Sequence, residues 1–360
     1  MWTTDASCVC MSPSDENKSN RPGKSLCPHS HRCTQMADPL LEVENLTTTF
    51  RTSEGEVSAV DDISYTVSPS NAVGIVGESG SGKSVSVRSI VRLIESPGEI
   101  KSGTVRWKGR DVLEMSTDEL RAIRGNEIAM VFQEPRSALD PAYTVGYQIA
   151  EGIRAHEDVS KQEAHERAIS LLEEVGIPNA EEAVNRYPHE YSGGMAQRAL
   201  VAQALACEPD LLIADEPTTG LDVTIQAQVI DLFERLQETR EMALLMITHD
   251  LGVVSEVCDD VIVMYAGRIA EKGSLEEIIA DPKHPYTRTF LNSVPRIDNP
   301  GELDPIDGMP PNLANPPSGC RFHPRCPDAK PLCKEERPPD VEFGPQRMSA
   351  CYIHTEEYHR

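Results

Sequence analysis

The stretch GESGSGKS (77–84) decides the fold of this chain. It fits the pattern G-x-x-x-x-G-K-[ST], in which glycines let the backbone approach phosphate oxygens and N–H groups surround them. In this pattern Lys83 reaches the β- and γ-phosphates, and the Ser84 hydroxyl binds Mg²⁺. The loop lies between a short apolar strand (72–77) and a predicted helix (Ser84–Leu93). This context favours a phosphate site over the alternative of a flexible Gly/Ser loop.

Apolar strands alternate with helical segments on both sides of this loop. Two alternating stretches upstream, 40–50 and 59–67, predict a pair of strands. Further strands are predicted at 105–107, 128–132, 211–215, 243–248 and 261–265. Apolar strands that alternate with helices indicate a mostly parallel sheet buried on both faces. The sequence therefore predicts an α/β P-loop protein with an N-terminal antiparallel β subdomain.

Two adjacent carboxylates follow the predicted strand LLIAD (211–215). At the carboxyl end of such a strand, Asp215 can hold the water shell of Mg²⁺, and Glu216 can orient and deprotonate an attacking water. Phosphoryl transfer needs mainly positioning and charge neutralisation, so one metal, one lysine and one base suffice. The alternative is a solvated acidic pair, but this pair directly follows apolar residues.

A second possible anion site is Ser192-Gly193-Gly194, which precedes a predicted helix over Met195–Ala206. Helix N-termini bind anions through free N–H groups and the helix dipole. A simple capped turn is the alternative. Two phosphate cradles with one P-loop lysine indicate that the second cradle serves the nucleotide of another subunit.

The P-loop, the SGG stretch and the carboxylates of ADEP (214–217) stand in one order along the chain. These three motifs in this order resemble those of the ATP-binding subunits of ABC transporters, and the resemblance covers about residues 40–280. The resemblance implies that Gln133 contacts Mg²⁺ or water, that His249 contacts the γ-phosphate, and that Asp222 lies at a dimer seam. It also implies that Phe50 stacks on adenine.

The resemblance thus implies an ATPase whose substrate is ATP and whose metal is Mg²⁺. Its catalytic residues are Glu216, His249 and Gln133. Mg²⁺ is expected at Ser84, Gln133 and Asp215. The residues expected to contact ATP or its phosphates are Gly77, Glu78, Ser79, Gly80, Ser81, Gly82, Lys83, Ser84, Val85 and Phe50. The signature residues expected at the partner's ATP are Ser192, Gly193, Gly194 and Met195.

The resemblance also implies an assembly. In a head-to-tail dimer, the P-loop of one subunit and the signature of the other enclose each ATP. The second ATPase subunit is expected to be a related but distinct chain, with a homodimer as the alternative. Two transmembrane permease subunits dock on a helical subdomain at about 134–205, and an extracellular solute-binding protein acts indirectly. We expect a peripheral protein at the cytoplasmic face of the membrane.

The C-terminal part carries a second resemblance. HPYT (284–287), LNSVP (291–295) and PIDGMPPNLANPPSGCRFHPRC (305–326) resemble the extension of the oligopeptide/dipeptide branch, whose relatives also carry nickel. We therefore divide the chain into an ATPase domain at 38–282 and an irregular extension at 283–360. The implied function is to power import of di- or oligopeptides. The alternatives are a nickel or other small-solute importer and a soluble ABC ATPase not tied to transport.

Four cysteines of this extension, Cys320, Cys326, Cys333 and Cys351, are separated by gaps of 5, 6 and 17 residues. Four thiolates suit an iron–sulfur cluster or a structural Zn²⁺. Zinc sites usually include a two- to four-residue gap, which is missing here. Members of the resembled branch carry a [4Fe–4S] cluster on such a set, so we expect a cluster, with zinc as the alternative. Disulfides or free thiols are a third possibility, and a cytosolic setting argues against disulfides.

The composition excludes some classes of protein. Asp and Glu number 58 against 34 Lys and Arg, a net charge of −24, so no nucleic-acid partner is expected. The positive charges are 10 Lys and 24 Arg. An acidic, lysine-poor surface keeps a protein soluble in concentrated salt, so we interpret the chain as cytosolic and from a halophile. An ordinary acidic protein is the alternative. No run approaches 18 apolar residues, so no membrane span is predicted.

The first residues differ from the rest. Residues 1–35 carry three acids and four bases, are rich in Ser, Pro and Asn, and show no periodicity. We therefore expect a disordered leader over 1–37, without the apolar region of a secretory signal. Met36 opens MADPLLEVENL, which is typical of a natural start, so an untranslated leader is the alternative.

Overall fold

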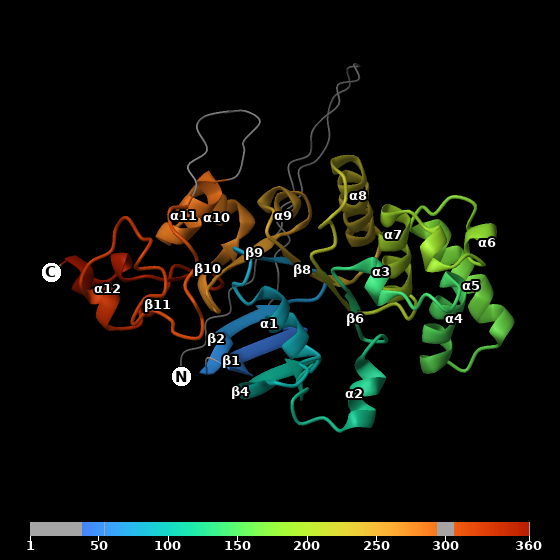
Figure 1. The fold of residues 1–360 in the computed structure, drawn as a ribbon, viewed down its shortest axis with the longest axis horizontal. Coiled ribbons are helices and arrows are strands. Elements are labelled where there is room, and N and C mark those ends of the chain that lie inside the picture. The colour runs from blue at the N-terminus through green and yellow to red at the C-terminus, as the bar shows by residue number, and fades with distance from the viewer. Residues whose placement is uncertain (1–37, 54, 294–305, 360) are drawn as a thin grey trace, which may run out of the picture. The chain divides into compact units, whose positions relative to one another are not determined.

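The computed structural model describes residues 38–53, 55–293 and 306–359, and the predicted leader 1–37 lies outside them. The described residues belong to one compact unit of the chain, 37–360. This unit contains an eight-stranded sheet and a four-stranded sheet with helices around them (Figure 1).

The larger sheet has the strand order β11-β12-β10-β9-β3-β8-β7-β6. Its five strands from β9 to β6 are parallel, and the other three are antiparallel, as expected for a mostly parallel sheet. The strands are β3 (Ala72–Val76), β6 (Ile128–Val131), β7 (Leu211–Asp215), β8 (Ala243–Thr248), β9 (Asp260–Tyr265), β10 (Arg268–Ser274), β11 (Asp340–Glu342) and β12 (Met348–Ala350). Because parallel strands share their carboxyl edge, the ends of β3, β6, β7 and β8 meet there.

The smaller sheet is the predicted antiparallel subdomain, with the order β2-β1-β4-β5. Its strands are β1 (Leu41–Thr52), β2 (Gly55–Val67), β4 (Gly98–Trp107) and β5 (Arg110–Asp111). The strand predicted at 105–107 is the end of the longer β4. The first part of β4, GEIKSGT, contains no buried residue and lacks the apolar alternation that would have revealed it.

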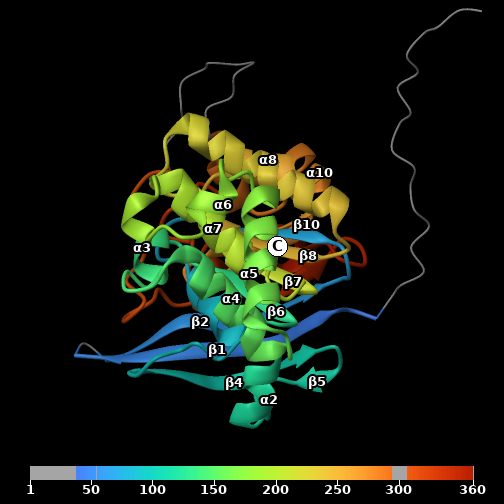
Figure 2. The same cartoon turned by 90° about the vertical axis from the view of Figure 1, so that its right-hand side faces the viewer.

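Side chains along the parallel strands alternate between two hydrophobic cores. On β8, Leu244 and Met246 pack in one core, and Leu245 and Ile247 pack in the other. The first core includes residues of α7 (Gly193–Ala204), α8 (Val223–Thr239) and α9 (Leu251–Val257). The second includes α1 (Lys83–Ile90), α2 (Thr117–Ile123) and the four-stranded sheet. Figure 2 shows α8 and α10 (Leu275–Ala280) on one side of the large sheet, with β1, β4 and α2 on the other.

The P-loop helix is shorter than predicted. Helix α1 ends at Ile90 rather than Leu93, and Arg92 has φ 52°. This left-handed conformation cannot continue a right-handed helix.

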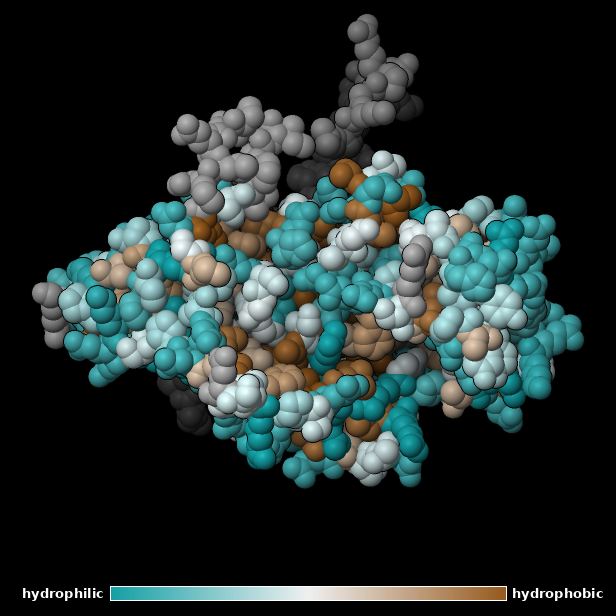
Figure 3. Space-filling model, in the orientation of Figure 1, coloured by the Kyte–Doolittle hydropathy of each residue, from teal (hydrophilic) through white to brown (hydrophobic). Residues whose placement is uncertain are grey.

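Between β6 and β7 the described chain is helical. Its helices are α3 (Pro135–Ala138), α4 (Val145–His156), α5 (Lys161–Glu174), α6 (Ala180–Ala183), the 3₁₀ turn η1 (Pro188–Glu190) and α7. Ser160 begins α5 by accepting the N–H of Glu163 at 3.1 Å, one of the two bonds of a capping box. The face of this segment visible in Figure 3 is mostly hydrophilic, in keeping with the acidic composition.

The extension is less irregular than expected. Residues 306–331 contain no helix or strand, but β11 and β12 continue the large sheet beyond β10. Two strands of three residues each are too short to show an alternating pattern in the sequence. The helical elements here are α11 (Pro285–Asn292), α12 (Leu332–Glu335), η2 (Tyr352–His354) and α13 (Glu356–His359). Within the described part of the chain, no helix has the length and apolar character needed to span a membrane.

Candidate active site

The P-loop joins β3 to α1 and depends on two glycines for its path. Gly77 has φ 151° and Gly82 has φ 99°, a range that side chains disfavour. A Cβ on Gly77 would lie 2.1 Å from the carbonyl oxygen of Met264, and one on Gly82 would lie 2.2 Å from that of Ala59. The neighbouring backbones therefore admit only glycine at both positions.

Lys83 is almost fully buried at the start of α1 and points back into the loop. Its Nζ donates hydrogen bonds to the carbonyl oxygens of Gly77 (2.7 Å) and Glu78 (3.0 Å). Burial lowers the pKa of Lys83, while the carboxylates of Glu216, Asp215 and Glu78 act in the opposite direction. The amine therefore lies among anionic groups and main-chain acceptors inside the loop.

The two residues predicted to hold Mg²⁺ and its water shell are in direct contact. The Ser84 hydroxyl donates to Asp215 Oδ1 at 2.7 Å, and Arg88 Nη2 donates to Asp215 Oδ2 at 3.3 Å. Asp215 ends β7 and is fully buried. Burial raises the pKa of Asp215, and the bonds from Ser84 and Arg88 oppose that rise. Hydroxyl and carboxylate oxygens are ligands that suit Mg²⁺, so this pair fits the ion.

Three further predicted residues converge beside this pair. Gln133 Nε2 donates to Glu216 Oε2 at 2.9 Å, and His249 Nδ1 lies 3.6 Å from Glu216 Oε1. Thr219, which the sequence did not single out, also donates to Glu216 Oε2 at 2.9 Å. Glu216 has φ 48°, which is unusual for a residue with a side chain and recurs at functional sites. Its carboxylate is thus contacted by Thr219 of its own loop and by Gln133 and His249 from two other segments.

Most of these groups line one open pocket of about 700 Å³, although Gly77 and Asp215 are not among its lining residues. The pocket has the size of a nucleotide site. Its lining residues are Glu78, Ser79, Gly80, Ser81, Gly82, Lys83, Ser84, Val85, Gln133, Glu216, His249, Phe290 and Pro310. Phe290 of α11 and Pro310 come from the extension and were missed in the sequence, since nothing in their local pattern points to a site more than 200 residues upstream.

Phe50 is not among the residues that line the pocket. It lies near the end of β1, paired with Val57 and Gly98. Stacking of Phe50 on adenine stays a prediction.

The signature residues also lie outside this pocket. Ser192 is exposed at the start of α7, where its side chain accepts the N–H of Met195 at 3.3 Å. Gly194 packs closely, because a Cβ there would lie 2.4 Å from Ile225 Cγ2. Asp222 is exposed and caps α8 by accepting the N–H of Ile225 at 3.0 Å. The N-termini of α7 and α8 are therefore both capped and lie at the surface of this chain.

The four predicted cysteine ligands line one cavity together with His284 and Phe322. All four are free thiols. Burial raises the pKa of Cys326 and of Cys351 to about 12. Within the described residues, no group of three or more His, Cys, Asp or Glu side chains is arranged to hold a metal ion. The fold thus gathers the thiols without bringing them into a ligand geometry.

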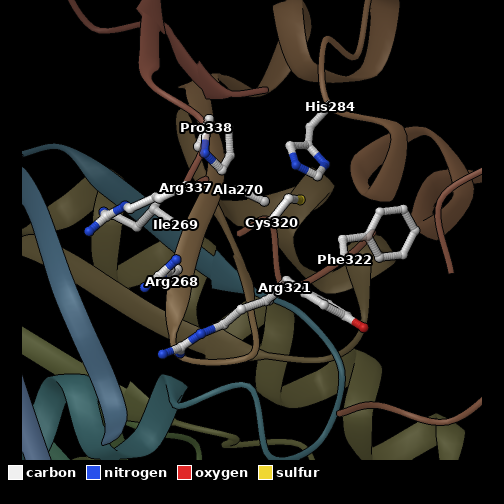
Figure 4. Close-up of a pocket in the computed structure, with 11 residues that line it drawn as sticks. Arg268, Ile269, Ala270, His284, Cys320, Arg321, Phe322, Arg337 and Pro338 are labelled. Atoms are coloured by element: carbon white, nitrogen blue, oxygen red, sulfur yellow. The ribbon is translucent and has the colours of Figure 1, made fainter. Parts of the chain in front are cut away.

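A second small cavity adjoins this region and is shown in Figure 4. Arg268 and Arg321 lie at one end of it, and Cys320, His284 and Phe322 lie at the other. Both arginines pair with Asp61 of β2, so this cavity lies where the extension attaches to the rest of the unit.

Two protein-family models match this chain. The ABC transporter model matches residues 60–219, which contain the P-loop, Gln133, the signature and the two carboxylates. The model for the C-terminal region of oligopeptide/dipeptide transporters matches residues 270–333, which contain three of the four cysteines.

Individual relatives agree with both models. The oligopeptide transport ATP-binding protein OppD of Salmonella typhimurium is 45% identical over 334 residues, covering 92% of this chain and 99% of that protein. The dipeptide transport ATP-binding protein DppD of Bacillus subtilis is 47% identical over 318 residues, covering 88% of this chain and 95% of that protein.

Solved structures add the fold. An ATP-binding cassette described as a dimer in a post-hydrolysis state with ADP and Pi superposes with a TM-score of 0.59 at 26% identity, covering 65% of this chain and 98% of that one. The cassette cbiO1 of Clostridium perfringens, part of an ABC transporter complex, gives 0.57 at 27% identity, covering 68% and 92%. The chain belongs to the ATP-hydrolysing, ATP-binding subunits of ABC transporters, in the branch that carries the oligopeptide/dipeptide transporter C-terminal region.

Proposed function

We propose that this chain hydrolyses ATP to power the import of di- or oligopeptides, as a peripheral subunit at the cytoplasmic face of the membrane. One observation carries the proposal: residues 78–85 of the P-loop line a single pocket together with Gln133, Glu216 and His249, and the buried Asp215 bonds to Ser84 of that pocket. The peptide cargo is supported by the extension and by the names of the relatives.

In the mechanism that this geometry supports, Lys83 exchanges its carbonyl partners for phosphate oxygens of ATP. Ser84, Gln133 and Asp215 would hold Mg²⁺ or its water shell, and the ion would neutralise charge on the phosphates. Glu216 takes a proton from the attacking water, and Gln133 and Thr219 keep its carboxylate oriented. His249, beside the same carboxylate, is available to the γ-phosphate.

The exposed signature supports a head-to-tail dimer. Ser192 lies outside the pocket of its own chain, so its helix start is free to meet the ATP of a partner. We propose a related second ATPase subunit as the partner, with a homodimer as the alternative. Two permease subunits and an extracellular solute-binding protein complete the proposed importer.

The test is transport by the reconstituted importer. The chain, purified with the subunits that accompany it, is expected to release phosphate and to move a labelled dipeptide into vesicles only when ATP is present. Movement of Ni²⁺ but not of peptide would select the nickel alternative. Phosphate release from the chain without any membrane partner or transport would favour a soluble ATPase.

We also propose a [4Fe–4S] cluster on Cys320, Cys326, Cys333 and Cys351, with Zn²⁺ as the alternative. Four thiols around one cavity fit either group by their chemistry. Backbone N–H groups of Asp328 and Ile353 favour the thiolate forms of Cys326 and Cys351 and so oppose the effect of burial. Anaerobically purified protein is expected to absorb near 400 nm, and colourless protein with one bound zinc would reject the cluster.

The halophilic origin stays a proposal drawn from the charge of −24. If the acidic surface is an adaptation to salt, unfolding temperature and ATPase rate should both rise from low to molar KCl, because salt screens the repulsion between carboxylates. An ordinary acidic protein would reach its maximum well below molar salt.

A further inference from the structure

The extension reaches the P-loop through one buried ion pair. Arg325 Nη1 donates to Glu78 Oε2 at 2.6 Å, and Arg325 Nη2 donates to Glu78 Oε1 at 3.0 Å. The Arg325 side chain is only 5% exposed, and the two residues are 247 positions apart. Paired bonds between a guanidinium and a carboxylate fix both position and orientation. Glu78, the second residue of the P-loop, is therefore held in a fixed position by Arg325 of the extension.

The main chain of the same P-loop residue has a second contact with this region. The N–H of Glu78 donates to the Tyr286 hydroxyl of α11 at 3.0 Å. Tyr286 is fully buried, and its ring packs against Tyr265 and Phe322. Arg325 lies over the Tyr265 ring, 5.8 Å from its centroid. The main chain of Glu78 is thus held by Tyr286 of an aromatic cluster, and its side chain is held by Arg325, which packs on the Tyr265 ring of the same cluster.

This contact lies where ATP is bound. Glu78 lines the nucleotide pocket, and its carbonyl oxygen accepts a bond from Lys83 Nζ. An unpaired carboxylate at this place would repel the triphosphate, and the guanidinium of Arg325 neutralises it. A shift of Glu78 would also move its carbonyl oxygen, which accepts a hydrogen bond from Lys83.

Arg325 itself is fixed by a tight turn that carries two of the four cysteines. The N–H of His323 donates to the carbonyl of Cys320 at 3.0 Å, and the N–H of Arg325 donates to that of Phe322 at 2.9 Å. Cys326 follows Arg325 directly in the sequence. The main chain that places the guanidinium therefore also places two thiols at the cysteine cavity.

We propose that Arg325 is a positioning residue for the ATP site, acting through Glu78. It neutralises the Glu78 carboxylate and holds the start of the P-loop in its ATP-binding conformation, so the cysteine turn and the nucleotide site are coupled. The proposal rests on ATP binding at the P-loop. It adds a residue from the extension to that site.

The first test compares two arginines of the extension region in the full-length protein. Arg325→Gln is expected to raise the dissociation constant of a fluorescent ATP analogue about tenfold, the loss expected for one hydrogen bond between charged groups. The rate at saturating ATP should stay within about threefold, because Arg325 does not touch the reacting atoms. The control is Arg288→Gln, since Arg288 pairs with Asp328 and leaves the P-loop untouched. Equal affinities in the two variants would overturn the proposal.

The second test separates action through Glu78 from mere support of the fold. Adding Glu78→Gln to Arg325→Gln removes the carboxylate left unpaired, so it is expected to restore most of the lost affinity. A purely structural role would give no such rescue, and a further loss would refute the coupling. If Arg325→Gln fails to fold, Tyr286→Phe decides, because it removes only the hydroxyl from the Glu78 N–H. An unchanged affinity in Tyr286→Phe would then overturn the proposal, and a threefold or greater loss would support it. A wild-type protein that does not bind the analogue would refute the ATP site itself.

Discussion

The nucleotide pocket and the four-cysteine cavity are both assembled from distant parts of the chain, yet they differ in how their side chains are held. In the pocket, polar groups already bond to one another, as in the pairs Ser84–Asp215 and Gln133–Glu216. In the cavity, the thiols are gathered by the backbone, and burial raises the pKa of Cys326 and Cys351 to about 12. The side chains of the first site are organised by hydrogen bonds to one another, whereas the four thiols of the second are gathered in one cavity without a metal-ligand arrangement among the described residues. Function at the first should therefore fail on single-atom changes.

The largest effect is expected at the base of the organised site. Glu216→Gln keeps the size of the side chain but removes its ability to accept a proton. Turnover should fall by about 10²-fold or more, the usual contribution of a general base. ATP binding should remain, and the closed dimer should accumulate. Phosphate release and nucleotide affinity are measured on the same preparation, and normal turnover would contradict the assignment.

The next comparison tests the backbone of the P-loop with two glycines. Gly82→Ala places a Cβ 2.2 Å from the Ala59 carbonyl, so we expect ATP affinity to drop by at least about tenfold and the protein to lose stability. Gly80→Ala is the matched control. Gly80 also has a positive φ of 76°, but a Cβ there meets nothing within 4 Å. Gly80→Ala should therefore lower the free energy of unfolding by only about 1 kcal/mol. Similar losses in the two variants would mean that close backbone approach does not matter.

The third prediction concerns pH and magnesium. Because burial raises the pKa of Asp215, its carboxylate should take up a proton at a higher pH than an ordinary aspartate does. Protonation would remove the charge that we propose holds Mg²⁺, so ATPase activity should fall as pH decreases through this pKa, by about tenfold per pH unit. Raising Mg²⁺ should move this acid limb to lower pH, because the ion competes with the proton. An acid limb that does not respond to Mg²⁺ would assign it to another group, and chelation of Mg²⁺ should abolish turnover.

The smallest effect tests whether the two sites communicate. Cys326→Ser alters the thiol next to Arg325, so we expect the affinity for ATP to fall by roughly threefold. This is less than the loss expected when a hydrogen bond between charged groups is removed. Cys207→Ser is the control, since Cys207 lies outside the cavity. Equal affinities in both variants would show that the cavity and the nucleotide pocket act independently.

Much of the active site could be predicted because its residues stand in short local patterns. The glycines, Lys83 and Ser84 share one loop, and Asp215 and Glu216 follow one strand. The sheet brings these segments together, since parallel strands end at one edge. The strands at 211–215 and 243–248 were predicted with the bounds that the structure gives them.

The contributions of the extension could not be predicted in this way. Phe290, Pro310 and Arg325 reach the pocket or its loop by tertiary contacts across more than 200 positions. A single sequence gives no signal for such pairs. HPYT was recognised as a distinctive motif, but the bond from the Glu78 N–H to Tyr286 appears only when α11 packs beside the P-loop. The positive φ of Glu216 is likewise imposed by its surroundings rather than by its residue type.

The pairing of β12 with β10 has a consequence for any shortened form of this chain. In the described unit, β12 bonds to β10 at Glu271 and Lys272, and β11 follows outside it. Cutting the chain after residue 282 would leave β10 as an edge strand with unpaired main-chain donors and acceptors. Such edge strands pair with strands of other molecules. We therefore expect a form cut at residue 282 to self-associate more readily than the full chain.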